Sequence, residues 1–140
     1  MMTDLFLAAK NEGITIEYCR LPTNGSISVQ DEDGDFVLMD YSLLTKSAEE
    51  RVHLAHELGH CVTGSFYSPY SESIVRKKGE NKADKWAIQK LITKSSLLRA
   101  IKKGYVEIWS LAEYFNVTEA FIRKALNLYR FENISDGCDL

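Results

Sequence analysis

The sequence has few of the features that mark fibrous, exported or membrane-spanning proteins. Only 2 Pro and 8 Gly occur in 140 residues, which excludes a collagen-like or proline-rich disordered chain. The longest stretch without a charged side chain, residues 58–71, is interrupted by histidine, serine, threonine and proline, and falls short of the ~20 apolar residues that cross a membrane. Asp4 lies where a signal peptide has lysine or arginine, so no export signal is expected.

Cysteine is also scarce, and its pattern does not indicate disulfide bonds. Cys19, Cys61 and Cys138 form no Cys-x-x-Cys pair, and their number is odd. Free thiols in a reducing cytoplasm are therefore the expected state. Because the sequence has no apolar stretch long enough to cross a membrane, no membrane partner is expected.

The remaining composition is that of one globular domain with unevenly distributed charge. Hydrophobic residues make up 45% and charged residues 26% of a chain close to the commonest domain size. The net charge of −3 combines −7 in residues 1–70 with +4 in residues 71–140. This asymmetry can indicate a basic surface for nucleic acid or for an acidic partner. Lysines on solvated helices explain it more simply, and we favour that interpretation.

Hydrophobic periodicity predicts an α+β domain in which a small three-stranded sheet precedes a helical C-terminal half. Residues 1–132 are expected to form one domain, with 106–130 as a helix-turn-helix-like hairpin inside it and 133–140 as a flexible tail. The predicted helices are 3–12, 47–63, 80–93, 96–103, 106–115 and 119–129, the predicted strands are 14–20, 26–30 and 36–40, and residues 64–79 are expected to be a loop.

The predicted helix 47–63 has both a start and a stop signal. Ser47 and Glu50 have the spacing of a capping box, in which both side chains cap backbone amides of the first turn. Gly64 follows the last turn, where a glycine commonly ends a helix. These signals place the most informative motif of the chain inside a helix.

That motif is HELGH, at residues 56–60. His56 and His60 lie on one face of the helix, about 6 Å apart along its axis, where two imidazoles can hold one metal ion. Glu57 lies ~100° further round the axis, placed to take a proton from a water molecule on the metal. Gly59 weakens the helix, which suggests that another element packs against this turn. An interpretation in which both histidines have no special role does not explain why two of only 3 histidines flank a glutamate at ligand spacing.

A zinc site needs a third protein ligand, with one position left for water. A carboxylate is expected, because no histidine follows His60 and Cys138 lies in the tail. Glu80, at the start of the next predicted helix, is the first candidate, although a favourable interaction with the helix dipole is an alternative reason for an acid there. Asp84, one turn later, is placed to accept a hydrogen bond from a ligand histidine. Glu72, in the predicted loop, is the second candidate.

The motif and the segments after it resemble a known family. HELGH, followed by TGSFY at residues 63–67 and by ENKADKWA at residues 80–87, is similar to the ImmA/IrrE family of metallo-endopeptidases. Short members of that family occur on prophages and mobile elements of Gram-positive bacteria. The resemblance covers about residues 14–129 and is strongest over residues 51–91.

The resemblance implies a gluzincin-like peptidase with one Zn²⁺ per chain. It implies that His56, His60 and Glu80 are the zinc ligands, that Glu57 is the catalytic residue and that Asp84 supports a ligand. The implied fold is a minimal zincin-like domain, a small sheet packed on the active-site helix. The strand over residues 36–40 would lie nearest the cleft, with an exposed edge that could pair with an extended peptide.

The group that stabilises the oxyanion is less well marked. Tyr67 and Tyr70, in the loop after the motif, are possible oxyanion donors, although aromatic residues that simply cover the core are an equal alternative. His53, one turn before His56, is given no role.

Two further patterns have simpler explanations. Asp31, Asp33 and Asp35 resemble the start of a calcium loop, but Gly34 is misplaced and Ser42 stands where a glutamate is needed, so a β-turn is expected.

Residues 110–126, SLAEYFNVTEAFIRKAL, resemble a helix-turn-helix with Arg123 and Lys124 on the second helix. Asn116 replaces the usual turn glycine, and a helical hairpin that completes the peptidase core is favoured. No direct DNA binding is expected.

The sequence therefore favours a zinc endopeptidase that acts on a protein. The resemblance points to a helix-turn-helix repressor of a mobile element or prophage as the substrate. A non-catalytic, metal-containing regulator and a toxin-like partner, binding a repressor, an antitoxin or DNA, are the alternatives. Glu57 favours the enzyme, because a pure scaffold does not need it. The oligomeric state is not predicted.

Overall fold

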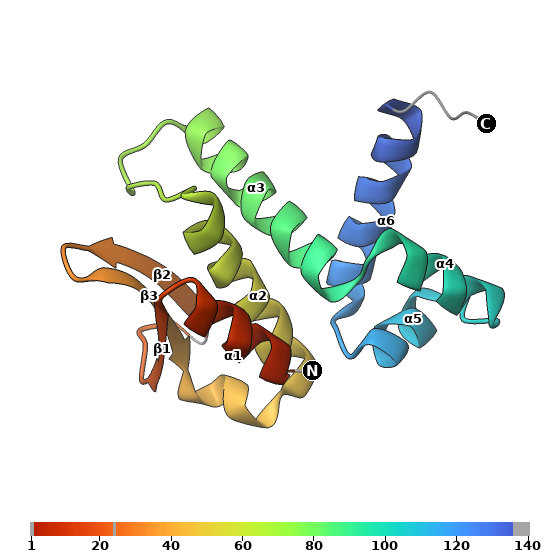
Figure 1. The fold of residues 1–140 in the computed structure, drawn as a ribbon, viewed down its shortest axis with the longest axis horizontal. Helices are drawn as coiled ribbons and strands as arrows, with labels where there is room; N and C mark the ends of the chain where they lie inside the picture. The colour runs from red at the N-terminus through yellow and green to blue at the C-terminus, as the bar shows by residue number, and fades with distance from the viewer. Residues whose placement is uncertain (1, 24, 136–140) are drawn as a thin grey trace.

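The computed structural model describes residues 2–23 and 25–135, with side chains up to residue 130 (Figure 1). In chain order the elements are α1 (Met2–Asn11), β1 (Ile14–Cys19), β2 (Ser26–Asp31), β3 (Gly34–Asp40), the 3-10 helix η1 (Tyr41–Thr45), α2 (Ser47–Thr63), α3 (Ser73–Leu91), α4 (Lys94–Lys102), α5 (Ile108–Phe115) and α6 (Glu119–Ser135). The α+β fold with a three-stranded sheet and a helical C-terminal half is confirmed. Across the described residues, every helix is too short or too polar to cross a bilayer.

The sheet has the strand order β1-β3-β2. β2 and β3 form an antiparallel hairpin, and β1 pairs with β3 in parallel on the other side. The prediction that residues 36–40 form an exposed edge is therefore wrong, because β3 has a hydrogen-bonded neighbour on each side. The edge next to the cleft is β2, whose Ser26, Ile27 and Ser28 line a cavity there.

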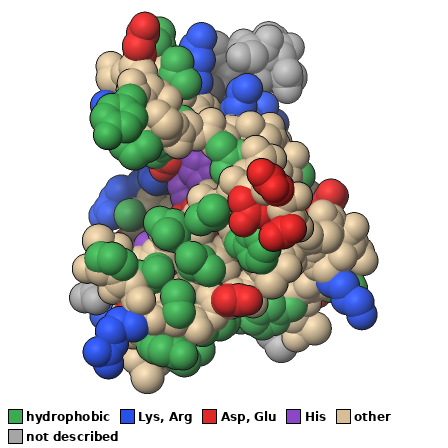
Figure 2. Space-filling view, turned by 90° about the vertical axis from the view of Figure 1, so that its left-hand side faces the viewer, with side chains coloured by type: hydrophobic (Ala, Val, Ile, Leu, Met, Phe, Trp, Pro, Cys, Tyr) green, Lys and Arg blue, Asp and Glu red, His purple; other side chains and the backbone are tan. Residues whose placement is uncertain are grey.

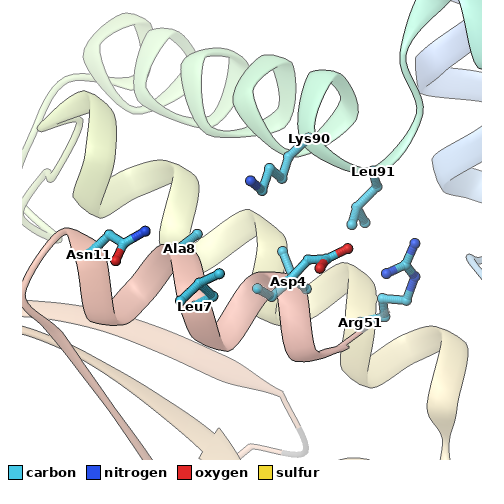
Figure 3. A pocket seen from close by; sticks show the side chains of 8 residues that line it. Asp4, Leu7, Ala8, Asn11, Arg51, Lys90 and Leu91 are labelled. Atoms are coloured by element: carbon cyan, nitrogen blue, oxygen red, sulfur yellow. The ribbon is translucent and has the colours of Figure 1, made fainter.

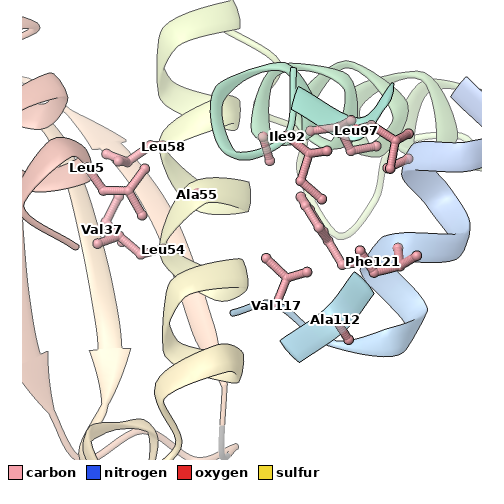
Figure 4. Packing of buried hydrophobic residues seen from close by; sticks show 14 of the residues in the cluster. Leu5, Val37, Leu54, Ala55, Leu58, Ile92, Leu97, Ala112, Val117 and Phe121 are labelled. Atoms are coloured by element: carbon pink, nitrogen blue, oxygen red, sulfur yellow. The ribbon is translucent and has the colours of Figure 1, made fainter. Parts of the chain in front are cut away.

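The hydrophobic core lies on both sides of α2 (Figure 4). On one side, Leu54 and Leu58 pack with Leu5 of α1 and Val37 of β3, and all four side chains are fully buried. On the other side of α2 lie buried side chains of the helical C-terminal half, among them Ile92, Leu97, Val117 and Phe121. The helix that carries HELGH thus packs against the sheet on one side and against α3 on another.

α2 and α3 pack closely where Gly59 lies. A Cβ atom at Gly59 would lie 2.5 Å from the carbonyl oxygen of Ala83 on α3, so only glycine fits at this contact. This confirms the prediction that another element packs against that turn. Glu80 and Asp84, on either side of Ala83 along α3, are thereby brought towards HELGH.

Replacing Gly59 with alanine is expected to lower the free energy of unfolding by about 2–3 kcal/mol, because the Ala83 backbone must move away. Gly79→Ala is the matched control with a smaller expected loss, since its Cβ would lie 3.1 Å from the Ser65 carbonyl oxygen. Urea unfolding measures both. A Gly59→Ala protein as stable as the wild type would contradict the close packing.

The predicted start of α2 is right, but its capping box is wrong. Lys46 is the N-cap residue, and its side chain makes no capping hydrogen bond. The Ser47 hydroxyl instead accepts a hydrogen bond from Asn116, and the Glu50 carboxylate accepts one from Tyr18. Gly64 ends the helix in the left-handed conformation, as predicted.

α3 begins at Ser73, seven residues before the predicted start at Glu80. Gly79, taken as the end of a loop, lies inside the helix, where a Cβ would crowd the Tyr67 ring at 3.2 Å. Glu80 is therefore in the second turn of α3 rather than at its first residue, which weakens the helix-dipole explanation for it.

α6 extends to Ser135, beyond the predicted end at 129, so the first residues of the expected tail are helical. The rest of that tail, residues 136–140, and Cys138 within it lie outside the described residues. Cys19 and Cys61 are free thiols.

Candidate metal centre

Two histidines of α2 and one glutamate of α3 converge on one point. Nε2 of His56 lies 3.0 Å from Oε1 of Glu80, and Nε2 of His60 lies 2.8 Å from Oε2 of Glu80. One potential ligand atom from each residue lies within 4.8 Å of the others, and the described residues contain this one group of metal-binding type. Two imidazoles and a carboxylate with one open position form a donor set that suits zinc.

Hydrogen bonds hold both imidazoles with Nε2 towards this point. His56 Nδ1 lies 2.8 Å from Oδ1 of Asp84, and His60 Nδ1 lies 2.9 Å from the carbonyl oxygen of Ser65. Both partners are acceptors, so each Nδ1 carries a proton. In the metal-free protein each Nε2 faces a Glu80 oxygen, and it does so in the direction in which it would bind a metal.

The charge around His56 favours its protonated form in the metal-free protein. Burial alone would lower the pKa of His56, but the hydrogen bond to Asp84 and the charges of Glu57, Asp84 and Glu80 outweigh it and raise that pKa above its usual value. A metal must displace this proton, so its affinity should fall at acidic pH.

Glu57 has partners on the sheet and on its own helix. The Ser26 hydroxyl of β2 donates a hydrogen bond to Oε2 of Glu57 at 2.8 Å, and Nδ1 of His53 lies 2.8 Å from the same hydroxyl. A hydroxyl has one proton to donate, so the His53 Nδ1–H is the donor to Ser26. Burial lowers the pKa of His53, which favours this neutral form. The chain His53–Ser26–Glu57 fixes the orientation of a carboxylate that is 8% exposed.

Of the other residues predicted to take part in the site, Tyr67 contacts the group, whereas Tyr70 and Glu72 do not. The Tyr67 hydroxyl donates to Oε2 of Glu80 at 2.8 Å, and this bond raises the pKa of Tyr67, so the phenol keeps its proton. Tyr70 is 96% exposed and lines neither cavity beside the group. Glu72 is the exposed N-cap residue of α3 and is not part of the group.

Two cavities meet at this group. One, of about 340 Å³, lies between α2, β2 and the loop that follows α2, and the other, of about 380 Å³, extends towards the start of α6. Ser26, His56, Glu57 and Glu80 line both of them. A substrate in this cleft would therefore pass directly over the converging ligand atoms. In Figure 2 histidine is visible in a hollow of the molecular surface.

The IrrE N-terminal-like domain of the M78 peptidases is the family whose model matches residues 9–127. The chain belongs to the ImmA/IrrE family. Its function is accordingly of the metallopeptidase type, as the resemblance implied. Comparison with curated proteins and with solved structures found no match.

In this ImmA/IrrE-family peptidase, the helix-turn-helix-like segment takes part in the cleft. Asn116 adopts the left-handed conformation between α5 and α6, with a φ of 54°. Lys124 of α6 lies 3.1 Å from Oδ2 of Asp84, and Arg123 pairs with Glu119 at 3.7 Å. Both basic side chains therefore face partners within the peptidase, and Lys124 lines the second cavity.

Sequence reasoning missed three residues of the peptidase site. Ser26 lies 31 positions from Glu57 and enters the site only through the sheet register. Ser65 contributes its main-chain carbonyl, which any residue type provides. His53 was given no role because its contact is with Ser26 of β2, and no signal within the helix itself could have assigned it.

Proposed function

We propose that this chain is a zinc-dependent endopeptidase in which His56, His60 and Glu80 hold one Zn²⁺ and Glu57 is the general acid–base. The observation that carries the proposal is the convergence of both Nε2 atoms on the two oxygens of Glu80, next to the Glu57 carboxylate. The second oxygen of Asp84 pairs with Lys124, which supports its role of orienting His56.

When bound, zinc would act as a Lewis acid that polarises the scissile carbonyl and acidifies the attacking water. Glu57 accepts the proton of that water and later passes it to the leaving amine. The Ser26 hydrogen bond leaves one carboxylate oxygen of Glu57 for this task. Tyr67, protonated and at the wall of the cleft, would donate to the developing oxyanion once its hydroxyl turns away from Glu80, whereas the exposed Tyr70 is a weaker candidate.

Replacing Ser26 with alanine is expected to lower kcat by about tenfold with little change in KM, because Glu57 loses the contact that orients it. Ser28→Ala is the matched control, since Ser28 lies two residues along β2 and lines the same cavity. Steady-state kinetics on the cleaved substrate measures the difference. Equal losses in the two variants would contradict a specific role for Ser26.

We further propose that the substrate is a helix-turn-helix repressor of a mobile element or prophage, and that the β2 edge pairs with its scissile segment.

The face of the sheet that points away from α2 supports docking of a folded partner. On that face Val29 lies opposite Phe36 and Ile27 lies opposite Leu38, and Ile27 is 44% exposed. Figure 2 shows hydrophobic side chains gathered together, with acidic side chains close by. The exposed acids of the 31–33 turn, at the end of β2, favour a basic partner such as a DNA-binding protein.

The proposed substrate class predicts narrow specificity. Zinc-loaded protein is expected to cleave a repressor encoded beside its own gene at one or few bonds, and to leave casein and short peptides largely intact, because docking supplies most of the affinity. Gel electrophoresis and mass spectrometry of the digests measure both. Rapid cleavage of casein at many bonds would contradict the docking proposal while leaving the peptidase proposal intact.

We propose that residues 1–132 act as one domain and that the hairpin 106–130 serves the cleft rather than DNA. The ion pair of Lys124 with Asp84 supports this interpretation, because it uses a side chain that a DNA reader would need free. Sequence-specific DNA binding by this chain alone is not expected.

A further inference from the structure

A third cavity lies away from the metal centre, between α1, α2 and α3 (Figure 3). Its volume is about 280 Å³, just below the usual range for drug-sized ligands, so it suits a small ligand. None of its lining residues lines either cavity of the metal centre. The cavity is therefore separate from the peptidase cleft, although α2 and α3 serve both.

Arg51 of α2 is the unusual residue of this cavity. Its side chain is only 9% exposed, and its Nε–H is buried without a hydrogen-bond partner. No hydrogen bond or ion pair joins its guanidinium to any of the described residues. A buried N–H group without an acceptor is costly in free energy. An oxygen acceptor placed beside this cavity, within reach of the Arg51 Nε–H, would therefore be stabilising.

The other polar residues of the cavity indicate the charge of the missing acceptor. Lys90 of α3 and Arg51 each bring a positive charge, whereas Asp4 of α1 brings a single negative charge. Asp4 lies close enough for its charge to act on Arg51, but it forms no ion pair with Arg51 or Lys90. Figure 3 shows the Arg51 and Lys90 side chains reaching the cavity from neighbouring helices. The charged groups therefore leave one positive charge uncompensated.

We propose that this cavity binds a small oxyanion, a phosphate ester or a carboxylate, between Arg51 and Lys90. Such an anion offers the oxygen acceptors that guanidinium and ammonium groups require. Leu5, Leu7 and Leu91 form an apolar part of the lining, which suits a ligand with a short hydrocarbon or ring body. A bound anion joins α2 to α3, the two helices that carry HELGH and Glu80.

The test is an NMR titration of the full-length chain with inorganic phosphate, phenyl phosphate and benzoate, observing the Arg51 Nε–H signal. That signal is expected to shift in a saturable manner. Lys90→Gln is expected to weaken binding by about two- to fivefold, whereas Lys78→Gln, at an exposed position of α3, should leave it unchanged. Asp4→Asn should tighten binding by a similar factor, because it removes a repelling charge.

The outcomes separate the possibilities. Tighter binding of phenyl phosphate than of inorganic phosphate would assign the site to a phosphate ester, and tighter binding of benzoate than of both phosphates would assign it to a carboxylate. Tighter binding of inorganic phosphate than of both organic anions would overturn the proposed ligand classes. No saturable shift with any of the three anions would overturn the proposal. Weaker binding in Asp4→Asn would contradict the repulsion expected between Asp4 and the anion, and would also overturn the proposal. The test keeps the buried Arg51 in every variant, so it does not depend on whether a protein without this side chain folds.

Discussion

The Glu57→Gln variant is expected to lose at least ~10³-fold in kcat while still binding one zinc ion per chain. Glutamine keeps the shape of Glu57 and can still accept the Ser26 hydrogen bond through its amide oxygen, but it cannot accept a proton from the attacking water. The proposed ligand atoms of His56, His60 and Glu80 are untouched by the change. Activity should therefore disappear without loss of metal or fold.

Cleavage of the repressor and zinc content are measured on the same preparations of this variant. Glu49→Gln is the matched control, because Glu49 lies on the exposed side of α2, in its first turn, and should keep full activity. Unchanged cleavage by the Glu57→Gln protein would contradict the mechanism. Loss of zinc from it would contradict the separate roles of Glu57 and the ligands.

The second large effect is expected for the His60→Ala variant, which should lose zinc. His60 is 5% exposed, and its Nδ1 is held by the Ser65 carbonyl, so its Nε2 is fixed before metal binds. Alanine removes one of the three proposed protein ligands from the site. Elemental analysis of protein purified without chelator should find about one equivalent of zinc in the wild type and less than a tenth in the variant.

His53→Ala is the matched control for that experiment. His53 is a histidine of the same helix, but it contacts Ser26 rather than Glu80. Its replacement should leave about one equivalent of zinc bound, even if catalysis falls. Equal zinc contents in the His60→Ala and wild-type proteins would rule out the proposed ligand set.

HELGH and its helix could be predicted from the sequence because their signals are local. The spacing of His56 and His60 fixes their common face, and Gly64 ends the helix through its own backbone preference. Gly59 was also informative, since its cost to the helix required a close neighbour, which is Ala83. Glu80 and Asp84 followed once a third ligand was required, although the start of their helix was placed too late.

The features that could not be predicted depend on contacts between distant parts of the chain. Ser47 and Glu50 fit a capping box, but Asn116 and Tyr18 bind them instead, and nothing local distinguishes the two outcomes. The position of β3 in the middle of the sheet follows from its parallel pairing with β1. Local hydrophobic alternation does not specify that pairing. The role of Ser26 could not be predicted either, because its contact with Glu57 also joins distant parts of the chain.

The most direct test of the account is a crystal structure of the zinc-loaded protein with diffraction data collected on both sides of the zinc absorption edge. The account predicts one anomalous peak per chain, in contact with Nε2 of His56, Nε2 of His60 and the carboxylate of Glu80. A peak bound to other residues, or no peak at this group after loading with zinc, would contradict it.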